Sequence, residues 1–249
     1  GSLKEQGRQA KYIYTIPTIQ NPTGTIMNRE RRLEMLEIAA EFNVPIFEDD
    51  CYSDLIWDQQ RPPAIYALDT DNRVIYCGTF SKTVAPALRV GYLVAHWDVM
   101  KHVLPLKTDA GSGALEQMVL AEILPKHFDA HVDALMPMLK EKSEAIVDAL
   151  AENFGSAAEF TVPVGGIYIW VTLPENVDSQ KLAAAAAAEG IAINPGPEWT
   201  VYGDQNKHRM RLCFGHPTIE NIREGVAKLA DVCHQEFGVP LRSGNIDRA

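Results

Sequence analysis

The residue whose type and surroundings are best suited to chemistry is Lys82. It closes the run GTFSK at residues 78–82, and Arg89 follows it seven residues later. A lysine amine can bond to a carbonyl carbon or take a proton from a neighbouring carbon. A guanidinium presents a fork of N–H donors that suits a carboxylate or a phosphate dianion. Taken alone, a lysine in a polar loop is typically a solvated surface residue and an arginine a salt-bridge partner, so these two residues permit covalent catalysis beside an anion-binding group without predicting it by themselves.

Three further motifs accompany this run along the chain. Residues 20–24 read QNPTG, residues 48–52 read EDDCY and residues 209–214 read RMRLCF. Taken alone, each is typical of an ordinary feature: a turn, a helix cap or a charged strand surface. Their order is far more specific, because NPTG is followed by Asp-x-x-Tyr and then by Ser-Lys with an arginine beyond it.

In this order the motifs closely resemble those of the fold-type I aminotransferases of class I/II, in particular the branch that holds 2-aminoadipate and kynurenine-type aminotransferases. The resemblance runs over almost the whole chain. It implies pyridoxal 5'-phosphate (PLP) as cofactor, and transfer of an amino group between an amino acid and a 2-oxo acid. It implies no metal.

The resemblance assigns catalytic roles to Lys82, Asp49 and Tyr52. Lys82 matches the lysine that bonds covalently to the cofactor and, once released, acts as general base at the substrate α-carbon. Asp49, three residues before the tyrosine, matches the aspartate that keeps the cofactor ring nitrogen protonated. Tyr52 and Asn21 match the two donors to the ring's phenolic oxygen. Asp50 is expected to point the other way, because side chains alternate along a strand.

The resemblance also assigns the anion-binding groups. Thr79, Ser81 and Arg89 match residues that bind the cofactor around its phosphate. Arg211 matches the arginine that clamps the substrate α-carboxylate, and Asn21 is placed beside the substrate as well.

The elements that must position these residues are those of an α/β fold. An alternating run predicts a strand over 11–16, and apolar runs predict buried parallel strands over 44–50, 73–80 and 89–95. A helix capped by Asn28 is expected over about 29–43. Buried strands joined by a helix favour a mostly parallel sheet. In such sheets ligands bind at the carboxyl ends of the strands, where the motifs lie.

The second half of the chain predicts a smaller α+β domain. Helices are expected over 112–124 and about 128–154, with a break or kink at Pro137 and a stop at Gly155. The elements expected beyond them are a long strand or strand pair over 160–173, a helix over 179–189, a strand over 209–214 and a helix over 218–236. We therefore expect the C-terminal part of a PLP-transferase-like large domain over residues 1–135 and a small C-terminal domain over 136–249.

Composition limits the possible classes. A net charge of -10 provides no electrostatic reason to bind nucleic acid or an anionic membrane, and no apolar run is long enough for a membrane span. The cysteines, Cys51, Cys77, Cys213 and Cys233, show no CxxC pair and no metal-ligand spacing with histidine. They favour reduced thiols in a cytoplasmic protein.

The resemblance also says what lies outside this stretch. Family members carry, ahead of the NPTG strand, a glycine-containing loop on the cofactor phosphate, an aromatic stacked on the ring and an arm that reaches the dimer partner. The chain starts only about ten residues before its first strand. We expect a homodimer in the full-length form and weak binding of PLP by this stretch alone.

Two other interpretations stay open. The same fold serves as the effector-sensing domain of MocR-type transcriptional regulators, which carry a GntR-type winged-helix DNA-binding head. A PLP-dependent lyase or decarboxylase is the third possibility, although Arg211 weighs against decarboxylation because it holds the carboxylate rather than expelling it.

Overall fold

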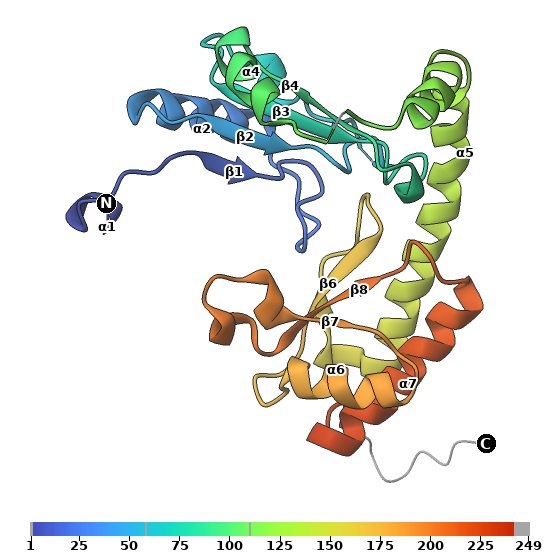
Figure 1. The fold of residues 1–249 in the computed structure, drawn as a ribbon. Helices are drawn as coiled ribbons and strands as arrows, with labels where there is room; N and C mark the ends of the chain where they lie inside the picture. The colour runs from blue at the N-terminus through green and yellow to red at the C-terminus, as the bar shows by residue number, and fades with distance from the viewer. Residues whose placement is uncertain (1, 58, 110, 242–249) are drawn as a thin grey trace. The chain divides into compact units, whose positions relative to one another are not determined.

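The computed structural model describes residues 2–57, 59–109 and 111–241, which form two compact units (Figure 1). The first holds the residues up to Asn21 together with Thr25–Ala134. The second holds Pro22–Gly24 and the described residues from Leu135 onward. The division falls inside helix α5 (Ala114–Phe154), which begins in the first unit and ends in the second.

The first unit is built around a four-stranded sheet in the order β1-β2-β3-β4. Its strands are β1 (Ile13–Thr15), β2 (Ile46–Asp49), β3 (Val74–Thr79) and β4 (Gly91–Val94). Its helices are α1 (Ser2–Glu5), α2 (Arg29–Glu41), α3 (Ile65–Leu68), α4 (Trp97–Val103), two 3-10 turns at Pro86–Leu88 and Leu104–Leu106, and the first part of α5.

One face of this sheet is the core of the unit. Along β2, Ile46, Glu48 and Asp50 are buried while the residues between them are half-buried, so the strand presents two different faces. Helices α2 and α3 supply apolar side chains to the buried face, and the resulting cluster consists of Ala39, Ile46, Ile65 and Val74 with Ile13, Met35 and Leu36 packed against it. Asn28 caps α2 as expected, since its side chain accepts a hydrogen bond from Arg31 N.

The direction of β4 differs from expectation. Strands β1, β2 and β3 run parallel, but β4 pairs antiparallel with β3. Its residues are mostly exposed rather than buried. The connection from β3 to β4 contains only the 3-10 turn Pro86–Leu88, whereas a parallel return needs a crossover of a dozen or more residues, usually a helix. The prediction that residues 89–95 form a buried parallel strand was therefore wrong.

The second unit contains an antiparallel sheet in the order β5-β6-β8-β7. Its strands are β5 (Glu159–Phe160), β6 (Tyr168–Thr172), β7 (Asn194–Pro195) and β8 (Arg209–Cys213). Its helices are the end of α5, α6 (Ser179–Ala188), α7 (Ile219–Phe237) and 3-10 turns at Gly155–Ala157, Gly196–Trp199 and Gly203–Asn206.

Helices α6 and α7 lie together against one face of this sheet (Figure 1). The side chains of Met210 and Leu212 are buried on that face, together with Leu182 of α6 and Leu229 of α7. Arg211 lies between Met210 and Leu212 in β8, so its side chain points to the opposite face.

Helix α5 also departs from expectation, because it is continuous across Pro137. Proline removes one backbone donor from a helix, and this loss is local. The 41-residue helix has no break at Pro137, and the predicted separation of a helix over 112–124 from one over about 128–154 was wrong. The predicted stop was correct, because α5 ends at Phe154 and Gly155 takes a positive φ of 55°.

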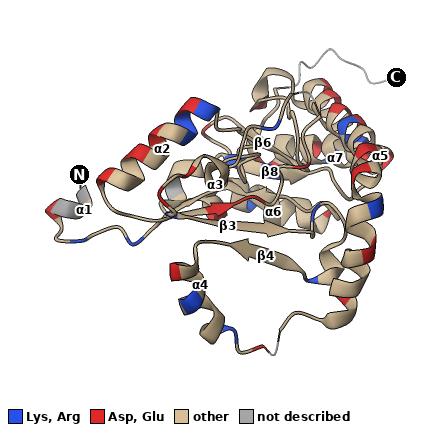
Figure 2. Ribbon diagram, turned by 90° about the horizontal axis from the view of Figure 1, so that it is seen from above, with Lys and Arg blue, Asp and Glu red and all other residues tan. Residues whose placement is uncertain are grey.

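None of the described helices has the length and apolar character needed to cross a membrane. Ribbon segments of acidic and of basic residues both occur along α5 and α7 (Figure 2). This mixed pattern is typical of solvated helix surfaces.

Candidate functional site

Asp49 is the last residue of β2, and two neutral groups hold its carboxylate. The Tyr14 hydroxyl donates to Oδ2 at 2.5 Å, and the Cys51 thiol donates to Oδ1 at 2.8 Å. Burial, followed by the hydrogen bond to Asp49, raises the pKa of both Tyr14 and Cys51. Burial and the nearby Asp49 charge also raise the pKa of the Cys77 thiol on the adjacent strand.

Lys82 lies three residues beyond the carboxyl end of the neighbouring strand β3. Its Nζ is 5.9 Å from the centre of the Tyr52 ring, within the range of a cation–π contact. Its positive charge also partly offsets the rise in the pKa of Cys51. Tyr52 itself is buried, with an exposed fraction of 5%. The structure thus places Lys82 beside the Tyr52 ring and within electrostatic range of Cys51, which bonds to Asp49.

The loop that carries Lys82 also presents the candidate phosphate ligands. The hydroxyls of Thr79 and Ser81 are 3.0 Å apart, and Ser81 N donates to Thr79 Oγ1 at 3.1 Å. Arg89 ends the 3-10 turn with a left-handed backbone (φ 51°, ψ 36°), and its guanidinium donates to the Pro86 carbonyl at 3.0 Å. Such a φ is uncommon for a residue other than glycine and often marks a functional loop.

Asn21 follows β1 in the loop that leads to the PTG turn. Its residue is half-buried, and its backbone carbonyl accepts a hydrogen bond from Gln20 Nε2 at 2.7 Å. Gln20 N in turn bonds to the Thr25 carbonyl at 2.8 Å, which closes the base of the loop. Asn21 thereby lies in a hydrogen-bonded loop that begins after β1.

The opposite face of β2 also carries carboxylates, but arginines accompany them. Glu48 is fully buried, accepts from the backbone N–H groups of Ile65 and Tyr66, and lies 3.8 Å from Arg32. Burial raises the pKa of Glu48 and lowers the pKa of Arg32.

Asp50 lies on the same face as Glu48. It accepts from Arg61 at 3.0 Å and from the Tyr76 hydroxyl at 2.7 Å. Asp49 and Asp50 therefore bind separate sets of partners, as strand alternation requires.

In the second unit, Arg211 is held on the exposed side of β8. Its Nη2 donates a hydrogen bond to Asn194 Oδ1 at 2.9 Å. Its guanidinium carbon lies 4.1 Å from the centre of the Trp199 ring and 5.3 Å from that of Tyr168. Two aromatic rings and one amide thus contribute to orienting the guanidinium.

Sequence reasoning missed several of these neighbours. Tyr14 and Cys51 were not assigned to Asp49, nor Asn194 to Arg211. The register of β1 on β2 would have indicated the contact of Tyr14 with Asp49. Tyr14 pairs with Phe47, and Phe47 lies on the same face of β2 as Asp49, two residues before it. The signal for Asn194 is its pairing with Arg211 across β7 and β8.

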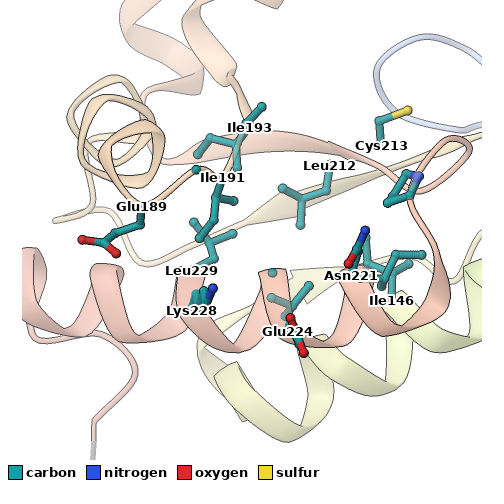
Figure 3. Close-up of a pocket in the computed structure, with 16 residues that line it drawn as sticks. Ile146, Glu189, Ile191, Ile193, Leu212, Cys213, Asn221, Glu224, Lys228 and Leu229 are labelled. Atoms are coloured by element: carbon teal, nitrogen blue, oxygen red, sulfur yellow. The ribbon is translucent and has the colours of Figure 1, made fainter.

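A pocket of about 340 Å³ lies elsewhere in the second unit, between β8, α7 and the chain that follows α6. Figure 3 shows Leu212 pointing into it toward Leu229, while Cys213 points away on the other side of the strand. Because Arg211 and Cys213 are two residues apart in β8, Arg211 also lies on the side away from this pocket. Over the described residues, no group of three or more His, Cys, Asp or Glu side chains is arranged to hold a metal ion.

The chain is similar in sequence to known proteins of one family. A family model described as aminotransferase class I and II matches residues 2–229. Aromatic-amino-acid aminotransferase 1 of Thermococcus litoralis is 34% identical over 238 residues, which cover 94% of this chain and 57% of the relative. The uncharacterized HTH-type transcriptional regulator YisV of Bacillus subtilis is 32% identical over 235 residues. These residues cover 93% of this chain and 48% of the regulator.

The fold agrees with a solved enzyme. The crystal structure of kynurenine aminotransferase from Pyrococcus horikoshii in complex with PMP superposes with a TM-score of 0.88 at 35% identity, over 97% of this chain and 59% of that chain. The chain therefore spans just under three fifths of the length of the two enzymes.

Proposed function

Because this chain belongs to the aminotransferase class I and II family, we propose that the protein transfers an amino group between an amino acid and a 2-oxo acid with PLP as its cofactor. The observation that carries the proposal is the contact of Lys82 with Tyr52, which places the lysine that follows β3 beside the segment that follows Asp49 at the end of the adjacent parallel strand β2. Ligands of open α/β sheets bind at that edge.

The side chains of the first unit fit the chemical groups of PLP. A ring nitrogen needs an anion, an aldehyde needs an amine, a phenolic oxygen needs donors, and a phosphate needs hydroxyls and a cation. The chain offers one of each at this edge, namely Asp49, Lys82, Tyr52 with Asn21, Thr79 with Ser81, and Arg89. Each Asp49 oxygen accepts one hydrogen bond from the protein, and a carboxylate oxygen has lone pairs for a second.

When bound, PLP supplies an electron sink for the bonds at the substrate α-carbon. Asp49 would hold a proton on the cofactor ring nitrogen, because an anion stabilises the protonated form. Lys82 would hold the cofactor covalently and, once released, carry a proton to and from the substrate α-carbon. Tyr52 would donate its hydroxyl to the phenolic oxygen, together with the Asn21 amide.

Anion binding would fall to two arginines. Arg89, Thr79 and Ser81 would bind the phosphate, where charge-assisted hydrogen bonds are strong. Arg211 would clamp the substrate α-carboxylate, because a guanidinium fork suits a carboxylate and Asn194, Trp199 and Tyr168 orient it. Asn21 would complete the substrate side.

The decisive experiment is the covalent trapping of PLP on the full-length protein with borohydride, followed by peptide mapping. The label is expected on Lys82 and is expected to disappear in Lys82→Ala, with loss of amino-group transfer. Lys101→Ala is the matched control, because Lys101 is an exposed lysine of the same unit paired with Asp98. A label on another lysine would contradict the assignment, and release of CO2 instead of a 2-oxo acid would favour a decarboxylase.

An effector-sensing domain of a transcriptional regulator is the second candidate. The observation that favours it is the 32% identity to the regulator YisV. Its prediction differs in two respects: Lys82 would take the label, but no amino acid would be converted, and the full-length protein would bind a DNA duplex through a separate winged-helix head.

The proposal extends to assembly and compartment. A homodimer is what the family resemblance implies, and a sedimentation measurement on the full-length protein tests it. A reducing compartment such as the cytoplasm agrees with the four cysteines, which are all free thiols in the structure.

A further inference from the structure

The carboxylate of Asp49 is held at both oxygens by residues that the proposed reaction does not otherwise use. Tyr14 donates to Oδ2 at 2.5 Å from a different strand, and Cys51 donates to Oδ1 at 2.8 Å from the turn just after β2. The two donors approach from two segments of the chain, so together they restrict rotation of the carboxylate about its side-chain bonds. A carboxylate with one donor per oxygen has a defined plane and direction.

The contact with Tyr14 follows from strand register. β1 and β2 are parallel neighbours (Figure 1), and Tyr14 pairs with Phe47. Their rings stack with centroids 5.9 Å apart and an interplanar angle of 25°. Since Asp49 is the next residue of β2 on that face, the phenol tip of Tyr14 reaches it. A one-residue slip in register would turn Tyr14 to the opposite face and remove the contact.

Both donors stay neutral and protonated. Burial and Asp49 raise the pKa of the phenol and of the thiol, so neither group loses its proton near neutral pH. A neutral donor stabilises a carboxylate without cancelling its charge, whereas the Arg61 guanidinium does cancel the charge of Asp50 next door. Neither donor therefore brings a positive charge to the Asp49 carboxylate.

We infer that Tyr14 and Cys51 are positioning residues, which aim the Asp49 carboxylate at the cofactor ring nitrogen and keep it charged for that contact. This inference rests on the proposed function, because it is the PLP ring nitrogen that Asp49 would meet. It assigns a role to the strand residue Tyr14, which lies 35 positions before Asp49 in the chain.

A double-mutant cycle on PLP affinity tests the part played by Tyr14 in the full-length protein. Tyr14→Phe removes only the hydroxyl and should weaken PLP binding about tenfold, the usual effect of losing a hydrogen bond to a charged group. In an Asp49→Asn background the same substitution should change affinity less than twofold, because the charged acceptor is gone. Equal losses in both backgrounds would show that Tyr14 acts through packing, and would overturn the inference.

Cys51 is tested by removal and conservative rescue. Cys51→Ala should weaken PLP binding several-fold, and Cys51→Ser should recover it to within about twofold, because a hydroxyl can donate from the same position. If the serine variant binds as weakly as the alanine variant, the thiol is not acting as a donor and this half of the inference is wrong.

A measurement without cofactor separates this inference from the proposed function. Ionisation of Tyr14 is followed by ultraviolet absorbance, as the difference between proteins with tyrosine and with phenylalanine at position 14. Asp49→Asn should move this ionisation to lower pH, because the carboxylate contributes to the raised pKa of Tyr14. An unchanged ionisation would overturn the contact even if PLP binds to Lys82. A shifted ionisation in a protein that binds no PLP would leave the contact standing and overturn the proposed function and the role built on it.

Discussion

The two faces of strand β2 hold their carboxylates in different ways. On the buried face, Glu48 and Asp50 are accompanied by the cations Arg32 and Arg61. On the other face, Asp49 is held by the neutral donors Tyr14 and Cys51. A carboxylate paired with an arginine inside the protein serves the fold, and its loss costs stability. A carboxylate held by neutral donors keeps its charge for a ligand, and its loss should cost function.

In the second unit, neutral side chains contact a positively charged group. Arg211 is oriented by an asparagine amide and two aromatic rings, all of which are neutral. The groups proposed to meet cofactor and substrate are thus oriented by neighbouring side chains before any ligand binds.

The largest expected effect is a loss of stability when the buried ion pair behind β2 is broken. Arg32→Met should destabilise the protein by about 3–5 kcal/mol, because it leaves Glu48 buried without its cation. It also removes the guanidinium bonds to the carbonyls of Met27 and Pro17. Urea unfolding, read from the midpoint at constant slope, measures the change. Arg31→Met is the matched control: Arg31 is exposed and forms a surface ion pair with Glu34, so its loss should stay within about 0.5 kcal/mol. Similar losses from both substitutions would contradict the role of burial.

A second prediction contrasts neighbouring residues on the two faces. Asp49→Asn should slow amino-group transfer about a hundredfold, roughly 2.7 kcal/mol, with little effect on stability. Asp50→Asn should do the reverse: a loss of about 1–3 kcal/mol of stability through Arg61 and Tyr76, and nearly unchanged turnover per folded molecule. Single-turnover rates and urea unfolding of both variants provide the comparison. Equal kinetic effects would show that the two faces are not functionally distinct.

The third prediction concerns the arginine of the second unit. Arg211→Lys should raise the KM for the amino acid about tenfold or more while leaving PLP affinity unchanged, because a lysine cannot form the two parallel bonds of a guanidinium fork. Asn194→Ala should have a smaller effect of the same kind, since it removes only the partner that orients Arg211. A fall in PLP affinity in either variant would place Arg211 at the cofactor rather than at the substrate.

The smallest expected effect belongs to a carboxylate outside both sites. Asp178 caps α6 by accepting from the N–H groups of Gln180 and Lys181, and it lies 3.3 Å from Lys207. Asp178→Ala should cost about 1 kcal/mol of stability and no activity.

The pH dependence of this cap has a definite sign. Partial burial would raise the pKa of Asp178, but the hydrogen bonds and Lys207 outweigh it and the pKa is lowered. A lowered pKa in the folded state means that the contribution is present above the unfolded value near pH 4 and is lost as the pH falls through the folded value. The difference in stability between Asp178→Ala and the wild type should therefore shrink in acid, and a constant difference down to the lowest pH would contradict the assignment.

Much of the fold was predictable from local patterns. The helix at 29–41 with its cap Asn28, the stop at Gly155 and the final helix at 219–237 all depend on residues within a turn or two of one another. The errors arose where local patterns end. Pro137 has a local cost, but a long helix with regular turns on both sides tolerates it.

The sequence by itself determined the family, the motif residues and the types of most elements, because hydrophobic periodicity, caps and motif spacing are properties of contiguous stretches. Only the tertiary structure decided that β4 runs antiparallel, that Tyr14 reaches Asp49 from the neighbouring strand, and that Asn194 and Trp199 hold Arg211. Each of these depends on which strands meet and in what register. A shift of one residue turns a side chain to the opposite face of the sheet, and no local pattern in the sequence specifies that register on its own.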